Sequence, residues 1–244
     1  MLRQFTAKGN VTARQICEPQ KYVNRFAEGL DQLRNKLLEM SALVESGILR
    51  SIHAVVHKDR AAAEEVFKIE ARINATELEI DALAVELLAL HQPMAKNLRF
   101  IIAALKINTD LERMGDLAVN IAQSALALIE APAGTPVVDI PYFAGLVQAM
   151  VHKSVDAFVA SDMDLAREVL ASDQAVDDFR TACYGQLTAF MQNDRARIRP
   201  TLSLLNVIRA AERLADHSKN IAEDVIFYVK GVDVRHRSSV PGPR

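Results

Sequence analysis

Two stretches of this chain, 100 residues apart, share a polar pattern as well as an apolar one. Residues 110–122 read DLERMGDLAVNIA, and residues 210–222 read AAERLADHSKNIA. Both contain a Glu-Arg pair, an aspartate four residues after the glutamate, and an asparagine four residues later. Two unrelated helices with the same heptad would share apolar positions, but they would not be expected to share these polar residues too. The sequence therefore predicts an internal duplication.

Each half is predicted to contain three amphipathic helices, and the halves meet at a breaker-rich segment, APAGTPVVDIP, at residues 131–141. In the first half, apolar residues recur at steps of three and four over 22–44, 66–90 and 107–128. This spacing is typical of helices with one buried face. Asp59 is a suitable N-cap for the second helix, and Pro93 ends it because proline cannot continue the hydrogen-bond ladder.

The second half repeats this plan. A helix over roughly 142–160 precedes one capped by Asp162, and the seven positions on the predicted buried face of the last helix, from Val207 to Tyr228, are those of the third helix plus 100. The predicted fold class is all-α, with two tandem, pseudo-symmetric three-helix bundles. The predicted domains are an N-terminal arm at 1–19, bundles at 20–131 and 140–231, and a flexible tail at 232–244.

Composition and charge support this class and limit the partners. The chain has only 9 glycines and 8 prolines in 244 residues, which favours helices over strands and turns. Its formal net charge of −2 gives no electrostatic case for binding nucleic acid. Cys17 and Cys183 form no CxxC pair, which fits a reducing compartment. The longest apolar run, 100–105, is too short to cross a bilayer, so we expect a cytoplasmic protein that reaches a membrane only through partners.

Carboxylates are paired at a spacing of four residues in both halves. The pairs are Glu112 with Asp116, Glu212 with Asp216, Glu77 with Asp81, and Asp173 with Asp177. Counting from the apolar positions, Glu77 is expected to correspond to Asp173, and Asp81 to Asp177. At about 100° per residue these side chains point away from the bundle core or toward its edge. Clustered carboxylate oxygens are suitable ligands for hard or borderline cations.

A plain solvated face is the alternative interpretation of any single pair. In that case Arg113 and Arg213 neutralise neighbouring acids in surface ion pairs. Four pairs in a repeated register favour a common role over four coincidences.

Three long segments each contain one acidic pair of α-helical spacing: INATELEIDALAVELLALHQP at 73–93, QPMAKNLRFIIAALKINTDLERMGDLAVNIA at 92–122 and AAERLADHSKNIAEDVIFYVKG at 210–231. These segments resemble the PhoU family of phosphate-signalling regulators. The resemblance implies a cytoplasmic, often dimeric protein of two three-helix bundles. It also implies a negative regulator of the phosphate-starvation response, which couples the phosphate ABC transporter, through its ATPase subunit, to a phosphate-sensor histidine kinase at the membrane.

The resemblance further implies a multinuclear metal cluster of iron, zinc, manganese or magnesium. Carried over residue by residue, the candidate ligands are Glu77, Asp81, Glu112, Asp116, Asp173, Asp177, Glu212 and Asp216. Asn120 and Asn220 continue the same stripes, and His217 offers an imidazole in the second half only. The halves also differ where Asp110 and Gly115 are matched by Ala210 and Ala215, so two sites with unequal properties are expected.

Two rival functions remain open. A carboxylate-bridged metal enzyme of the ferritin type needs Glu-x-x-His pairs, and no glutamate in the chain has a histidine at that spacing. No catalytic triad pattern and no GxxxxGK[ST] phosphate loop is present either, so we expect no enzyme. The second rival is a metal-independent helical adaptor, in which the acidic faces bind basic patches on a partner protein.

Overall fold

Six α-helices account for most of the residues that the structure describes. The computed structural model describes residues 19–131, 138–192 and 195–234. The helices are α1 (Pro19–His57), α2 (Arg60–His91), α3 (Ala95–Ile129), α4 (Ile140–Ala160), α5 (Met163–Met191) and α6 (Ile198–Lys230), with a 3-10 turn at Arg195–Arg197 before α6. No strand occurs within these ranges.

The helix ends follow the capping signals of the sequence. The Asp59 carboxylate accepts a hydrogen bond from the Ala62 amide at 3.1 Å, and Asp162 accepts from the Leu165 amide at 3.1 Å. These two predicted N-caps are therefore confirmed. α2 ends two residues before Pro93, where Gln92 turns into the left-handed region at φ 45°.

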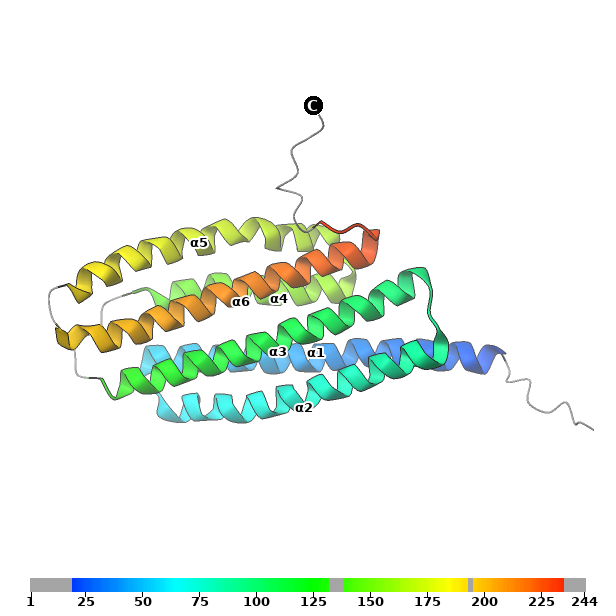
Figure 1. Ribbon diagram of the computed structural model, residues 1–244, viewed down its shortest axis with the longest axis horizontal. Coiled ribbons are helices and arrows are strands. Elements are labelled where there is room, and N and C mark those ends of the chain that lie inside the picture. The colour runs from blue at the N-terminus through cyan, green and yellow to red at the C-terminus, as the bar shows by residue number, and fades with distance from the viewer. Residues whose placement is uncertain (1–18, 132–137, 193–194, 235–244) are drawn as a thin grey trace, which may run out of the picture.

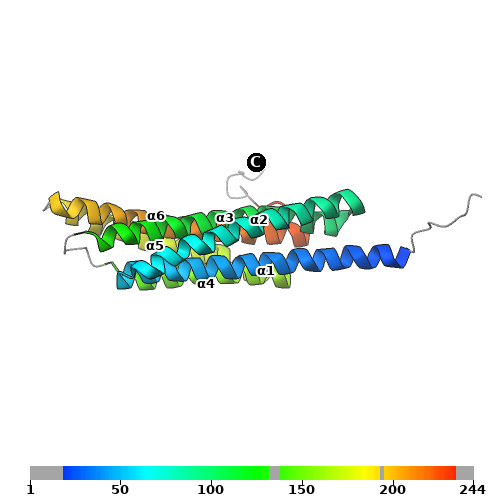
Figure 2. The same ribbon diagram turned by 90° about the horizontal axis from the view of Figure 1, so that it is seen from below.

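The helices form two three-helix bundles that lie side by side (Figure 1). α1, α2 and α3 pack together, as do α4, α5 and α6, and the most extensive contact between the bundles joins α3 to α6. Figure 2 shows α3 and α6 on one side of the molecule and α1 and α4 on the other. α2 and α5 flank this central group at the outer edges in Figure 1.

α3 and α6 run antiparallel along the middle of the molecule. Arg99 donates from Nε to the carbonyl oxygen of Tyr228 near the end of α6, whereas Asp110, near the middle of α3, meets His217 near the middle of α6. The rings of Phe100, Phe158 and Tyr228 pack together near one end, with the Phe100 and Phe158 centroids 5.5 Å apart. The core is thus continuous across both bundles, and the duplicated helices form its central seam.

No helix in the described ranges is both long and apolar enough to cross a bilayer. Of the predicted N-terminal arm, residues 1–18 lie outside the described residues, as does the predicted tail beyond residue 234. Cys17 falls in the first of these segments, and Cys183 is a buried free thiol whose pKa is raised by burial.

Candidate functional site

The register between the halves is 100 residues for α2 and α5, as it is for α3 and α6. Buried positions pair at this spacing as Val66 with Ala166, Ile69 with Val169, Thr76 with Val176, and Leu87 with Leu187. The expected match of Glu77 with Asp173 therefore does not hold. Glu77 corresponds to Asp177, and Asp173 takes the place of buried Ile73. Apolar residues spaced by three and four still largely align when one helix is shifted by four residues. The sequence pattern alone therefore does not distinguish the two alignments.

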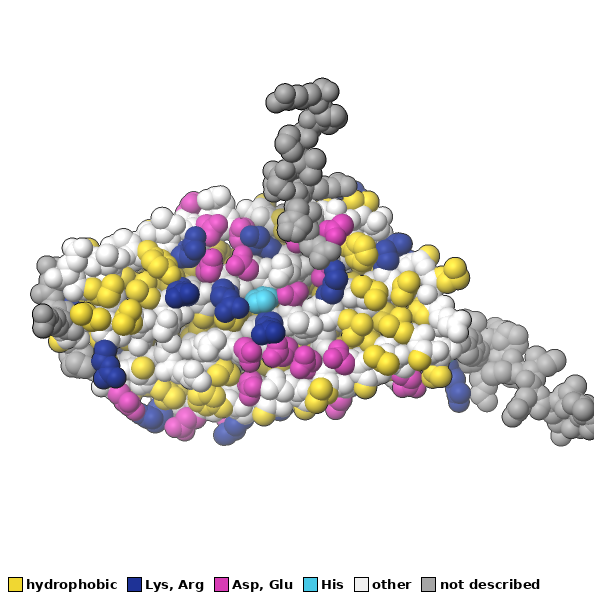
Figure 3. Space-filling model, in the orientation of Figure 1, with side chains coloured by type: hydrophobic (Ala, Val, Ile, Leu, Met, Phe, Trp, Pro, Cys, Tyr) yellow, Lys and Arg dark blue, Asp and Glu magenta, His cyan; other side chains and the backbone are white. Residues whose placement is uncertain are grey.

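The first acidic face consists of Glu77, Glu112 and Asp116, over α2 and α3. Figure 3 shows Asp and Glu side chains in a row over these two helices. The Glu112 side chain is only 21% exposed. Burial first, and then the charges of Asp116 and Glu77, raise the pKa of the Glu112 carboxyl above its usual range, and Glu70 adds to the effect. Arg113 opposes it, with Nε 3.6 Å from a Glu112 oxygen.

The second acidic face consists of Asp173, Asp177, Glu212 and Asp216, over α5 and α6. Two cations lie among these carboxylates. Arg180 donates to Glu212 at 3.2 Å and lies 3.4 Å from Asp177. Lys219 donates to Asp173 at 2.6 Å and lies 3.5 Å from Asp216. Every carboxylate of the second face therefore has a cationic partner from its own bundle.

Burial, and then the charge of Asp216, raise the pKa of the Glu212 carboxyl above its usual range, as happens for Glu112. Arg180 opposes this shift without cancelling it, and the charges of Asp177 and Asp173 add to it. Burial by itself lowers the pKa of Lys219, but the hydrogen bond to Asp173 and the charges of Asp173 and Asp216 outweigh it and raise the pKa. Lys219 is therefore a protonated cation at neutral pH.

Sequence reasoning missed Arg180 and Lys219. At the 100-residue spacing, Arg180 stands where the first half has buried Ile80, and Lys219 stands where it has Val119. The signal was present in the sequence as two charges at positions that are apolar in the other copy.

The other sequence-predicted residues make different contacts. Asp81 lies one turn after Glu77 on α2, is exposed, and accepts a hydrogen bond from the Asn108 side chain at 3.0 Å. The same Asn108 amide group donates to the Glu77 carbonyl oxygen at 3.1 Å. Asn120 and Asn220 lie on the α3–α6 seam instead, since each step of four residues rotates the position by about 40° around the helix. His217 also belongs to the seam, with Nδ1 2.7 Å from an Asp110 oxygen. Arg213 lines a groove there and forms no ion pair within the described ranges, unlike Arg113.

The two faces differ in how well they suit a metal ion. Among the described residues, no three His, Cys, Asp or Glu side chains converge closely enough to hold one ion. The second face does not fit a metal, because Arg180 and Lys219 already contact all four of its carboxylates. The first face fits by its donor chemistry, since its carboxylates repel one another and carry oxygen ligands alone. The eight predicted ligands as a set stay a prediction.

Comparison with known proteins decides the family. A family model described as the PhoU domain matches residues 37–125 and again residues 141–225. The chain belongs to the PhoU family. The two matched PhoU domains fall one on each bundle, which agrees with the duplication seen in the sequence.

Relatives and solved structures extend this match over most of the chain. The phosphate-specific transport system accessory protein PhoU homolog of Pseudomonas aeruginosa is 39% identical over 216 residues, covering 87% of this chain and 88% of the relative. The Caulobacter vibrioides homolog is 35% identical, covering 87% and 93%. Crystal structures of PhoU from Pseudomonas aeruginosa and of a phosphate transport system regulatory protein PhoU from Streptococcus pneumoniae align with TM-scores of 0.82 and 0.79, at 36% and 26% identity. They cover 85% and 86% of this chain, and 100% and 99% of their own chains. The predicted all-α fold of two three-helix bundles is confirmed.

Proposed function

We propose that this protein is an accessory protein of phosphate-specific transport and a negative regulator of the phosphate-starvation response. The observation that carries the proposal is the match of the PhoU domain to both bundles, together with relatives that carry the accessory-protein name over 87% of the chain. The protein acts by binding and not by catalysis. It couples the ATPase subunit of a phosphate ABC transporter to a sensor histidine kinase, and it reaches the cytoplasmic side of the membrane through these partners.

The turn between α2 and α3 offers a surface for such a partner. Leu90, Met94, Leu98 and Ile102 are exposed there, and the Met94 side chain is 82% exposed. Figure 3 shows hydrophobic side chains gathered at this end of the molecule. Exposed apolar side chains that lie together are typical of protein interaction surfaces. A second copy of the chain is a further candidate partner, because the family resemblance predicts a homodimer.

The experiment is capture of partners from cells grown with abundant phosphate, using the full chain and a Met94→Asp/Leu98→Asp variant. The wild-type protein is expected to retain the transporter's ATPase subunit and the histidine kinase, and the variant is expected to lose at least one of them. Leu202→Asp is the matched control, because Leu202 is also exposed on a helix but lies far from this turn. Recovery of neither partner by the wild-type protein contradicts the proposal.

We also propose that any bound metal belongs to the first acidic face. A cation there offsets the mutual repulsion of Glu77, Glu112 and Asp116, which adds to the larger effect of burial in raising the pKa of Glu112. This assigns the metal to fewer residues than the eight predicted from the sequence. The metal-independent adaptor is the competing proposal, and it keeps the same partners while using the first face as a docking surface for basic groups.

A further inference from the structure

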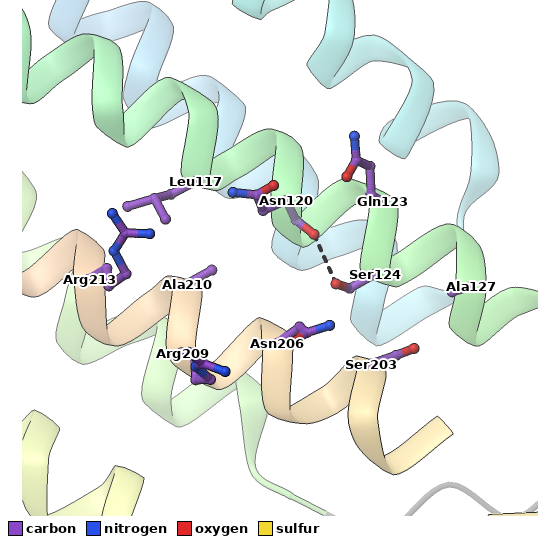
Figure 4. Close-up of a pocket in the computed structure, with 10 residues that line it drawn as sticks. All are labelled: Leu117, Asn120, Gln123, Ser124, Ala127, Ser203, Asn206, Arg209, Ala210 and Arg213. Atoms are coloured by element: carbon purple, nitrogen blue, oxygen red, sulfur yellow. Dashed lines mark hydrogen bonds between the residues drawn. The ribbon is translucent and has the colours of Figure 1, made fainter. Parts of the chain in front are cut away.

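A polar groove lies between α3 and α6 toward one end of the seam (Figure 4). Its volume is about 500 Å³, within the range of small-molecule sites. α3 contributes the side chains of Asn120, Gln123 and Ser124, and α6 contributes Asn206, Arg209 and Arg213. None of the ten lining residues is acidic. The groove is therefore cationic, although the chain as a whole is slightly negative.

The duplication shows what this groove lacks. At the pseudo-symmetric place on the seam, Asp110 accepts a hydrogen bond from Asn220 at 3.2 Å and contacts His217. Lys106 donates to Asp224 there at 2.7 Å. In the 100-residue register these residues are replaced in the groove as follows: Asp110 by Ala210, His217 by Leu117, Lys106 by Asn206 and Asp224 by Ser124. One place on the seam is thus filled by a charged network, and its counterpart has lost both carboxylates.

The two arginines of the groove have no acid of their own. Arg209 and Arg213 are one helical turn apart, and neither forms an ion pair or a side-chain hydrogen bond in the described part of the chain. Their counterparts in the other half are Thr109 and Arg113, and Arg113 contacts Glu112. The Asn120 amide nitrogen points toward the Arg213 side of the groove in Figure 4. Guanidinium and amide donors without a protein acceptor are the groups that bind oxyanions.

We propose that this groove binds the phosphate group of a small molecule, with Arg209 and Arg213 as its charged donors. The groove sits between two rigid helices and is the size of a small-molecule site, which favours a compact anion over an extended acidic peptide. The phosphate group comes either as free inorganic phosphate or as part of a nucleotide. The proposal concerns the isolated protein and does not depend on the partners of the proposed function.

The test is isothermal titration calorimetry of the purified full chain at physiological ionic strength, with inorganic phosphate in one arm and ATP in the other. One of these probes is expected to bind with one site per chain. Arg209→Gln/Arg213→Gln is expected to weaken binding about tenfold or more, because it removes the charge-assisted hydrogen bonds. Arg113→Gln is the matched control, since it removes an arginine at the position equivalent to Arg213, and it is expected to leave binding unchanged.

A second variant tests the site while keeping both arginines. Ala210→Asp restores the carboxylate that the other copy carries as Asp110, and it is expected to abolish binding by pairing with the arginines. Thermal unfolding of each variant checks that the fold is intact. The proposal is overturned if neither probe binds the wild-type protein. It is also overturned if the double variant binds as well as the wild type, or if Arg113→Gln weakens binding equally. If neither phosphate nor ATP binds the wild-type protein, and Arg209→Gln/Arg213→Gln loses partner capture, the groove binds an acidic protein segment instead.

Discussion

The two halves of the molecule share one backbone plan but treat their charges in opposite ways. The acidic face of the first half has one exposed arginine, Arg113, at its edge. Its Glu112 side chain is partly buried beside other carboxylates. The second face has gained Arg180 and Lys219, each joined to two carboxylates. The two equivalent places along the α3–α6 seam also differ. A charged network lies around Asp110, and an open groove lies around Ala210.

This difference shows which parts of a duplicated fold are free to change. Most buried positions of the duplicated helices agree between the halves, because each change in packed volume costs stability. The exceptions include Ile73 and Ile80, which are replaced by the partly buried Asp173 and Arg180. Charged positions at the edges of the bundles can change in pairs, since a carboxylate and a cation that arrive together keep the surface neutral. Each bundle therefore offers a different surface to ligands and partners while the fold remains the same.

The largest difference is expected on the seam. Lys106→Met removes the cation that donates to the buried Asp224 carboxylate, and it is expected to lower the free energy of unfolding by about 2 kcal/mol. Asn206→Met, at the equivalent position, changes a side chain that lines the open groove, and it is expected to change the free energy by less than about 0.5 kcal/mol. Urea unfolding of both variants measures this. Equal losses of stability for the two variants would mean that the contact of Lys106 with Asp224 stabilises the fold no more than the groove residue Asn206 does.

A smaller difference is expected between the two acidic faces. Arg180→Gln leaves Glu212 and Asp177 without their shared cation, and it is expected to cost about 1 kcal/mol, because the Arg180 side chain is partly exposed and water screens the loss. Arg113→Gln is expected to cost between about 0 and 0.5 kcal/mol, because that arginine is more than half exposed. Chemical denaturation of the pair gives the comparison, and a larger loss for Arg113→Gln contradicts it.

The smallest effect is a gain in stability. Because the pKa of Glu112 is raised in the folded protein, its ionisation as pH rises through that raised pKa costs stability. In protein freed of metal with a chelator, Glu112→Gln is therefore expected to stabilise the fold by roughly 0.5 kcal/mol at neutral pH. This gain is expected to disappear as pH falls below the ordinary glutamate pKa of 4.5. Glu212→Gln is expected to gain less, because it also weakens the contact with Arg180.

Unfolding curves of these two glutamine variants, taken at neutral and at acid pH, test the sign. A gain for Glu112→Gln that grows on acidification is the opposite of the expected dependence. A larger gain for Glu212→Gln than for Glu112→Gln would mean that Arg180 stabilises the Glu212 carboxylate no better than Arg113 stabilises the Glu112 carboxylate.

The sequence was sufficient for the fold but not for the detail of the charged surfaces. Apolar periodicity and the caps at Asp59 and Asp162 follow from local chemistry, and the structure agrees with both. The equivalent of Asp173 in the first half depends on how α5 is aligned with α2, and the apolar pattern allows that alignment to shift by four residues. The partners of Asp110, and the Glu212 partner of Arg180, lie on other helices, so these contacts arise from packing that a one-dimensional pattern does not encode.

The groove around Arg209 and Arg213 illustrates the same limit. Both arginines are visible in the sequence, and Arg213 was expected to neutralise a nearby acid as Arg113 does. Only the antiparallel contact of α3 with α6 places it beside Asn120 and away from carboxylates.

The first acidic face is proposed to be open to a cation, whereas the second is closed by Arg180 and Lys219. The direct measurement is elemental analysis of untagged protein purified without added metal, beside Glu112→Ala/Asp116→Ala and Glu212→Ala/Asp216→Ala. We expect metal in the wild-type protein, its loss from the first variant and its retention in the second. Metal lost from the second variant but kept in the first, or no metal in the wild-type protein, would show that the first face is not a metal site.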